Sequence, residues 1–162
     1  LYEGTLMSAL HQFKYQGKIA MEKSLGPLLA AFAGTWMTGG KDALIMPVPL
    51  HPGRLRERGF NQSLLLARHV AGSLECELDF HSLRRVKHTS PQAGLKSGER
   101  RKNVRRAFQV MAPKSVKGRF VVLIDDVATT GSTLNECARV LKRAGADKVC
   151  GLVLARTIIT VS

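Results

Sequence analysis

The chain has 162 residues, of which 44% are hydrophobic, and a formal net charge of +13. This length and composition are typical of one globular domain with its own core, so residues 1–162 are predicted to form a single domain. They exclude a membrane-spanning protein: no apolar run approaches the roughly 20 residues that a helix needs to cross a bilayer, and we expect no membrane insertion.

The three cysteines lie far apart and form no Cys-x-x-Cys pair. Neither a zinc site nor a disulfide framework is therefore predicted. Small, partly buried thiols in a reducing compartment are the expected alternative, which makes the cytoplasm the predicted location. These residues are Cys76, Cys137 and Cys150.

Two helices are predicted near the N-terminus. The first covers about 5–15, where apolar residues recur at helical spacing. The second covers about 21–36, and because a Gly-Pro pair interrupts it early, a start at Pro27 is the alternative.

A buried strand is predicted at 43–46, and a proline-rich loop follows it at 47–53. The prolines end the strand and stiffen the loop, because proline lacks an N–H and has a fixed φ. Ligands bind to loops at this edge of the sheet in open α/β folds. Three arginines come next, and their planar side chains suit phosphate oxygens, although a solvated loop is the alternative. They are Arg54, Arg56 and Arg58.

The middle of the chain predicts a helix at about 63–71, with Asn61 as its N-cap. Strands are predicted at 78–83 and 107–111, and they are expected to pair. Between them, residues 84–106 hold nine basic residues against one acidic residue. A polar loop of this length is usually functional or mobile, and its charge calls for an anionic partner or free solvent.

A strand, a polar turn and a helix follow one another closely near the C-terminus. The apolar run 121–124 predicts a strand buried on both faces. The small and hydroxylated residues 128–133 form the turn, and a helix is predicted at 134–144, capped by Ser132 or Thr133. Such a turn aims backbone N–H groups at an anion, and its glycine lets the backbone approach the ligand closely.

Two carboxylates, Asp125 and Asp126, stand between this strand and the turn. Beside a phosphate they would repel the ligand. They fit the site if they accept hydrogen bonds from sugar hydroxyls or face a divalent cation. The sequence therefore predicts a phosphorylated sugar together with Mg²⁺.

A last strand is predicted at 149–155, after Gly145 ends the helix. Strands that alternate with helices predict an α/β fold with a mainly parallel, twisted sheet flanked by helices. A P-loop and a Rossmann dinucleotide site are excluded, because neither Gly-Lys-Ser/Thr nor Gly-x-Gly-x-x-Gly occurs.

The stretch 121–133 resembles the signature of the type I phosphoribosyltransferases: an apolar strand, two acidic residues and a Thr-Thr-Gly-x-Thr loop. The resemblance implies their fold, with an N-terminal helical hood at 1–40, and implies phosphoribosyl pyrophosphate (PRPP) and Mg²⁺ as ligands. In that family the acidic pair contacts the ribose hydroxyls. This role falls to Asp125 and Asp126, which would also contact Mg²⁺ directly or through water. The loop that holds the 5′-phosphate corresponds to Ala128, Thr129, Thr130, Gly131, Ser132 and Thr133.

The same resemblance implies where the pyrophosphate binds. The family's loop after the first strand corresponds to Val48, Pro49 and Leu50, and Arg54 and Arg58 follow it. A loop that closes over PRPP corresponds to the basic segment 84–106, which is therefore expected to be mobile. Its candidates for contact with the leaving pyrophosphate are Arg85, Lys87, Gln92 and Arg101.

Four further motifs are similar to those of the ComF family, the competence-associated branch of these proteins. They are Pro-Val-Pro-Leu at 47–50, Arg-x-Arg-x-Arg-Gly-Phe-Asn-Gln-Ser at 54–63, Lys-Tyr-x-Gly at 14–17 and Leu-Ala-Arg-Thr at 154–157. Members commonly carry an N-terminal zinc ribbon, which this sequence lacks, so no zinc is expected. The resemblance implies a role in DNA uptake during natural transformation, with competence-machinery proteins as partners.

Three functions are compatible with these features. The first is transfer of the phosphoribosyl group to an acceptor that no motif identifies. The second is a non-catalytic accessory of transformation that binds single-stranded DNA through residues 84–106. The third is a regulator that binds PRPP without turnover. No feature of the sequence predicts an oligomeric state.

Overall fold

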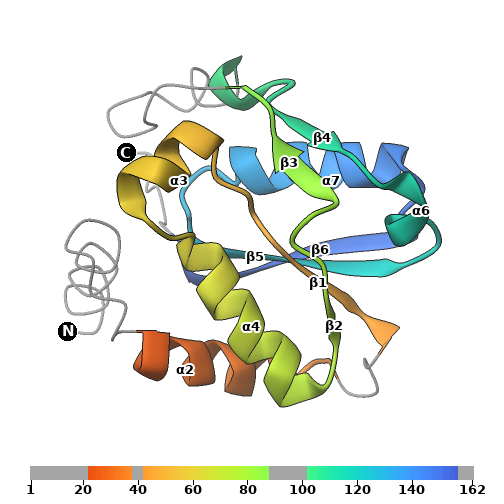
Figure 1. Cartoon of the computed structure of the whole chain (residues 1–162). Helices are drawn as coiled ribbons and strands as arrows, with labels where there is room; N and C mark the ends of the chain where they lie inside the picture. The colour runs from red at the N-terminus through yellow and green to blue at the C-terminus, as the bar shows by residue number, and fades with distance from the viewer. Residues whose placement is uncertain (1–21, 38–41, 88–101, 157–162) are drawn as a thin grey trace, which may run out of the picture.

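The structure is a computed structural model that describes residues 22–37, 42–87 and 102–156 (Figure 1). Its elements, in chain order, are α2 (Glu22–Gly34), β1 (Leu44–Pro47), α3 (Pro52–Arg58), α4 (Gln62–Leu74), β2 (Glu77–Leu78), β3 (Leu83–Arg85), β4 (Phe108–Val110), α6 (Pro113–Val116), β5 (Phe120–Ala128), α7 (Ser132–Arg143) and β6 (Lys148–Arg156).

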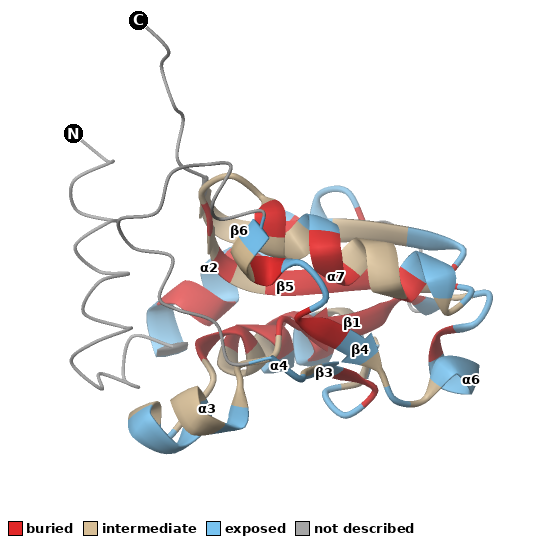
Figure 2. Cartoon of the chain, turned by 90° about the horizontal axis from the view of Figure 1, so that it is seen from above, coloured by how far each residue is buried: buried red, intermediate tan, exposed pale blue. Residues whose placement is uncertain are grey.

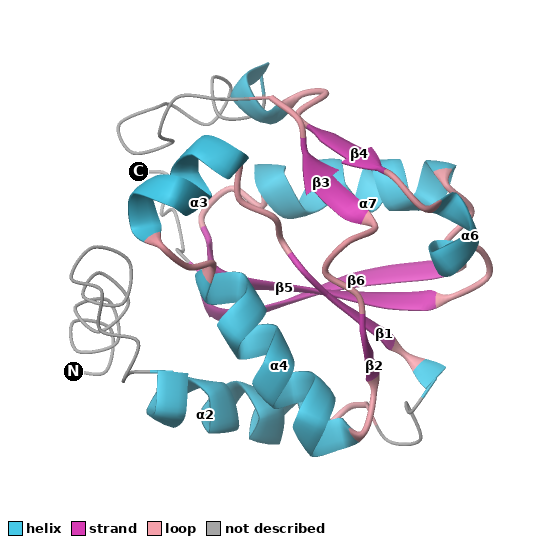
Figure 3. Ribbon diagram, viewed as in Figure 1, coloured by secondary structure: helices cyan, strands magenta, loops and turns pink. Residues whose placement is uncertain are grey.

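Four of the strands form one parallel sheet in the order β2-β1-β5-β6. Helices lie on both faces of this sheet, with α2 and α4 on one side and α7 on the other (Figure 3). The strands β3 and β4 form a separate antiparallel pair beside α7. The predicted α/β fold with a mainly parallel sheet is confirmed.

The central strands β1 and β5 are buried on both faces (Figure 2). Ile45, Val122 and Ile124 pack with α2 and α4 in one cluster. Their neighbours in sequence, such as Leu44 and Leu123, pack with α7 and β4 in a second cluster. This alternation follows from the period of two along a strand and confirms the doubly buried strand predicted at 121–124.

The helix α2 begins at Glu22, which confirms the start predicted near residue 21 and excludes the alternative start at Pro27. Leu25, ahead of the proline, is buried against α4, and this packing outweighs the local interruption. The preceding glycine permits a close approach of the two helices: a Cβ at Gly26 would lie 2.2 Å from the His69 ring.

The strand predicted at 78–83 is wrong as a single element. Asp79 breaks it, because its Oδ1 accepts hydrogen bonds from the N–H groups of His81 and Ser82, both at 2.9 Å. The part before the break, β2, extends the parallel sheet beside β1. The part after it, β3, pairs with β4, as expected for residues 107–111.

The basic segment is described only at its two ends, since 88–101 lie outside the described residues. The backbone N–H of Val86 donates to the Ala107 carbonyl at 2.8 Å, which brings the two ends together. Arg106 has a left-handed backbone (φ 58°), and its N–H donates to Glu136 Oε1 at 2.7 Å. The helix α7 therefore fixes the point where the segment returns to the fold.

The helix predicted at 5–15 also lies outside the described residues, so the N-terminal hood stays a prediction. The described part of that region, α2, packs against α4 and β6. Within the described ranges, no helix has the length and apolar character needed to cross a bilayer.

Candidate functional site

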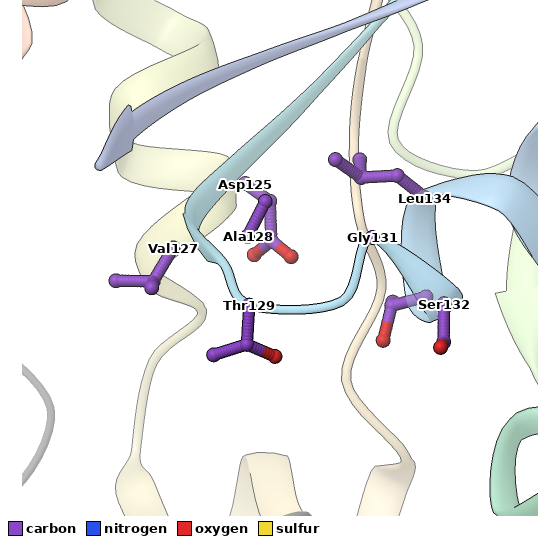
Figure 4. A pocket seen from close by; sticks show the side chains of 8 residues that line it. Asp125, Val127, Ala128, Thr129, Gly131, Ser132 and Leu134 are labelled. Atoms are coloured by element: carbon purple, nitrogen blue, oxygen red, sulfur yellow. The ribbon is translucent and has the colours of Figure 1, made fainter. Parts of the chain in front are cut away.

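A pocket opens where β5 ends and the chain turns into α7 (Figure 4). It is open to solvent, and the figure of about 240 Å³ for its empty space includes open solvent. The predicted phosphate loop 128–133 contributes every residue except Thr130 to the described pocket wall. The lining residues are Asp125, Val127, Ala128, Thr129, Gly131, Ser132, Thr133 and Leu134.

The N-terminus of α7 forms one wall of this pocket. Its N-cap is Gly131, with φ 69°, so the expected cap by Ser132 or Thr133 is wrong. The hydroxyls of Thr130 and Ser132 instead bond to each other at 2.7 Å and tighten the turn. Asn135 N donates to Gly131 O at 2.8 Å as the first bond of the helix, and Ser132 N donates to Thr130 Oγ1 at 3.4 Å. The first N–H groups of a helix have no carbonyl acceptor within the helix and are directed towards its N-terminal end. Together with the helix dipole, they favour an anion there.

The two carboxylates have different environments. Asp125 lines the pocket, and its carboxylate lies inside the turn beside Thr129 and Gly131 (Figure 4). Asp126 is 5% exposed and is absent from the described pocket wall. Its Oδ1 accepts a hydrogen bond from the N–H of Val127 at 2.8 Å. The structure therefore places Asp125, but not Asp126, where a ligand in the pocket would meet it.

The two strands beside β5 end at different points. The last residue of β1, Pro47, pairs with Ile124, so beyond this point β6 is the only strand partner of β5 among the described residues. There the acidic side chains bond to the backbone, since Asp125 Oδ1 accepts from Asp126 N at 3.0 Å. Together with the bond from Val127 N to Asp126 Oδ1, this bond gives backbone N–H groups acceptors beyond the end of β1.

The segment predicted to bind pyrophosphate begins at the same edge of the sheet. Val48 N donates to Ile124 O at 2.9 Å, and Pro49 and Leu50 follow, both half-buried. Asn61 is the N-cap of α4, as predicted, with its Oδ1 accepting from Ser63 N. The sequence analysis missed a further contact, in which Ser63 Oγ donates to Asp125 Oδ1 at 2.9 Å. Ser63 is the last residue of the motif at 54–63, but nothing in that motif indicates that Asp125 is its partner.

The three arginines after this segment lie in α3, a helix that the sequence analysis did not predict. The helix starts there because Pro52 suits its first turn and His51 Nδ1 accepts from Gly53 N at 3.2 Å. Arg54 is half-buried and forms a 3.6 Å ion pair with Glu57. Arg58 is half-buried in the last turn.

Arg85, on β3, is a further basic residue near the site. Its guanidinium lies 5.4 Å from the centre of the Phe108 ring, and the residue is half-buried. Burial is the main cause that lowers the pKa of Arg85 from its ordinary value; Cys137 and Asp125 oppose the shift, and Arg54 adds to it. Asp125 on β5 and Arg54 on α3 therefore both lie within electrostatic reach of Arg85 on β3.

Of the other residues predicted in the basic segment to contact the pyrophosphate, the structure describes only Lys87. Lys87 is exposed just after β3, and Gln92 and Arg101 lie outside the described residues.

Behind the site, Cys137 on α7 is fully buried, and this burial raises the pKa of its thiol well above the ordinary value. The three cysteines form no disulfide with one another.

The side chains at the site suit Mg²⁺ better than a metal ion that takes all its ligands from the protein. Among the described residues, no group of three or more His, Cys, Asp or Glu side chains could hold an ion. Mg²⁺ is commonly held by one or two carboxylates together with substrate phosphates and water. Asp125 at the pocket fits that arrangement.

Comparison with known proteins agrees with this geometry. A family model described as a phosphoribosyl transferase domain matches residues 61–159. Competence protein F of Haemophilus influenzae is 35% identical over 96% of this chain and 69% of its own length. The chain belongs to the ComF family of phosphoribosyltransferase-domain proteins. Other relatives of this ComF chain include DNA utilization protein YhgH of Escherichia coli K12, which is 37% identical over 97% of the chain and 70% of its own length.

Solved structures give the same fold for this ComF domain. A hypoxanthine phosphoribosyltransferase of Staphylococcus aureus matches with a TM-score of 0.53 and 13% identity, covering 84% of this chain and 65% of that one. A purine phosphoribosyltransferase of Pyrococcus horikoshii matches with a TM-score of 0.51 and 16% identity, covering 86% and 85%. At these identities the likeness establishes the fold alone.

Proposed function

We propose that this chain binds PRPP with Mg²⁺ and transfers its phosphoribosyl group to an acceptor nucleophile. The observation that carries the proposal is one pocket that combines the N-terminus of α7 with the carboxylate of Asp125. The helix start suits the 5′-phosphate, while the carboxylate suits ribose hydroxyls next to it.

In the proposed reaction, the acceptor attacks C1 of the ribose. The bond from C1 to the pyrophosphate oxygen breaks, and the pyrophosphate leaves with the electron pair. The N–H groups at the start of α7 hold the sugar phosphate, and Asp125 orients the ring. When bound, Mg²⁺ would be held by Asp125 and the ligand's phosphates, where it neutralises negative charge on the leaving group.

The pyrophosphate would lie between the 48–50 segment, α3 and β3. Arg85 is the described cation closest to this role, because it interacts electrostatically with Asp125, and Arg54 in turn acts on Arg85. A partly buried guanidinium stabilises a developing negative charge more strongly than an exposed one does. Arg58, Lys87 and the undescribed part of 84–106 are proposed to add to this positive field.

Asp126 is the second carboxylate of the proposed pair. Because it is 5% exposed and bonded to the backbone of Val127, it would have to move to reach the ligand. We therefore assign the larger share of ribose and Mg²⁺ contact to Asp125.

Two measurements test this function. Titration calorimetry of the protein with PRPP, in the presence and absence of Mg²⁺, should show Mg²⁺-dependent binding. A pyrophosphate-release assay over a panel of bases and amines should then identify an acceptor. Binding without release for every acceptor would favour the PRPP-sensing regulator, and no binding would contradict the proposal.

Binding of single-stranded DNA is a second candidate function, and surface charge favours it. At the described ends of the basic segment, the exposed cations include Arg84, Lys87, Lys102 and Arg105. The names of the relatives, which mention competence and DNA utilization, point to the same process. We propose that it takes place in the cytoplasm, where the competence machinery would supply the protein partners.

Phosphate contacts make DNA affinity fall steeply as salt is added. Measuring affinity for a single-stranded oligonucleotide between 50 and 200 mM salt, roughly the span over which such contacts weaken sharply, tests this function. A response that is flat over this range would count against DNA binding through these residues.

A further inference from the structure

The start of α4 contacts two parts of the proposed site that are far apart in sequence. Asn61 Nδ2 donates to the carbonyl oxygen of Val48 at 3.2 Å. Ser63 Oγ donates to Asp125 Oδ1 at 2.9 Å. Val48 opens the segment proposed for the pyrophosphate, and Asp125 is the carboxylate proposed for the ribose. The first turn of α4 therefore connects both halves of the ligand site (Figure 1).

We infer that Asn61 and Ser63 are positioning residues that hold the ribose carboxylate and the pyrophosphate segment in one arrangement. This inference rests on the proposed function. It assigns neither residue a contact with the ligand, because each acts through a group that it orients.

The Ser63 contact fixes the orientation of the Asp125 carboxylate. Oδ1 accepts two hydrogen bonds, from Ser63 Oγ and from the N–H of Asp126 at 3.0 Å. Ser63 is 5% exposed, and α4 is anchored by buried residues such as Leu66 and Val70. The donor therefore has little freedom to move. A carboxylate that is already oriented loses less conformational entropy when a ligand binds.

The Asn61 contact fixes the segment after β1. Its side-chain amide performs two roles with two atoms: Oδ1 accepts from Ser63 N at 3.1 Å and caps α4, while Nδ2 donates to Val48 O. The N–H of Val48 donates in turn to Ile124 O at 2.9 Å. Both backbone polar groups of Val48 are thus bonded, one to β5 and one to α4.

The Ser63 contact is tested with Ser63→Ala and three probes: PRPP, ribose 5-phosphate and inorganic phosphate. A hydrogen bond to a charged group is lost, so affinity for the two ribose-containing probes should fall roughly tenfold. Affinity for inorganic phosphate, which needs only the start of α7, should stay unchanged. The control is Ser73→Ala, at an exposed position near the other end of the same helix, and it should bind all three probes as the wild type does.

A double-mutant cycle with Asp125→Ala separates positioning from general stability. If Ser63 acts through Asp125, then Ser63→Ala has no further effect on ribose 5-phosphate affinity once Asp125 is replaced. An effect that persists in that background would overturn the inference, as would equal losses for phosphate and ribose 5-phosphate.

The Asn61 contact is tested with Asn61→Ser. Serine keeps the N-cap, so the melting temperature should change little, but its short side chain cannot also reach the Val48 carbonyl. Affinity for inorganic pyrophosphate should fall several-fold, and unchanged affinity would overturn this half of the inference. A wild-type protein that binds neither PRPP nor ribose 5-phosphate would overturn the proposed function itself. Wild-type binding with unaffected variants would overturn only the positioning roles.

Discussion

The replacement of Gly131 by valine tests how the proposed phosphate site is built. Gly131 has φ 69°, in the left-handed region that costs an L-residue about 1–2 kcal/mol, and a β-branched side chain fits it poorly. A Cβ there would meet only Asn135 Nδ2, at 3.7 Å, so the cost comes from the backbone conformation and not from a clash. Relief of this strain requires a change of φ, which turns the N–H groups at the start of α7 away from the anion.

The fold provides a matched control in Gly118. It has φ 72° with no atom within 4 Å of an added Cβ, and it lies in the turn before β5, at the opposite end of that strand from the pocket. Gly118→Val should therefore carry a similar backbone cost. Each kcal/mol should lower the melting temperature by about 2–4 °C in a chain of this size.

The assay combines thermal unfolding with calorimetry of phosphate and PRPP. Both variants should lose about 1–2 kcal/mol of unfolding free energy. Only Gly131→Val should also lose ligand affinity, by at least about tenfold, since each hydrogen bond to a charged group is worth about 1.5–3 kcal/mol. Equal ligand affinities for the two folded variants would refute the idea that the start of α7 binds the phosphate.

Three other predictions follow from the site. Asp125→Asn should weaken PRPP binding more than Asp126→Asn does in calorimetry, because only the first carboxylate lines the described pocket; the reverse order would contradict the assignment. Arg85→Met should reduce affinity for inorganic pyrophosphate while leaving that for inorganic phosphate intact, and equal losses would indicate general damage. The hydrogen bonds from Arg139 hold the pKa of the Glu136 carboxyl below its ordinary value of 4.5. The ionised carboxylate therefore stabilises the fold fully above pH 4.5, and this stabilisation is lost as the pH falls through the lowered pKa. Glu136→Gln should thus lower the unfolding free energy by about 1 kcal/mol at neutral pH, and by less in acid; a difference that does not shrink with pH would exclude this linkage.

The strand, turn and helix at the pocket could be predicted because their signals are local. An apolar run, two acids and a glycine-containing turn lie in one continuous stretch, and a strand that is apolar on both faces indicates a parallel sheet. The N-cap of α4 was predicted for the same reason, since Asn61 bonds to a residue two positions away.

The parts that sequence could not predict depend on distant partners or on competing local bonds. Ser63 and Asp125 are 62 positions apart, so no periodicity connects them. Nothing in the strand predicted at 78–83 indicated that Asp79 would bond to the backbone of the following residues and divide this strand between two sheets. Pro27 indicated a helix start, but the burial of Leu25 against α4 extends the helix before it.

A crystal structure of the protein with PRPP and Mg²⁺ would test the central claim most directly. The measured quantities are the distances from the 5′-phosphate oxygens to the backbone nitrogens of residues 131–134, and from the ribose hydroxyls to Asp125. Our account predicts hydrogen-bond distances, about 2.7–3.2 Å, for both. A PRPP molecule bound elsewhere, with no phosphate at the start of α7, would contradict it.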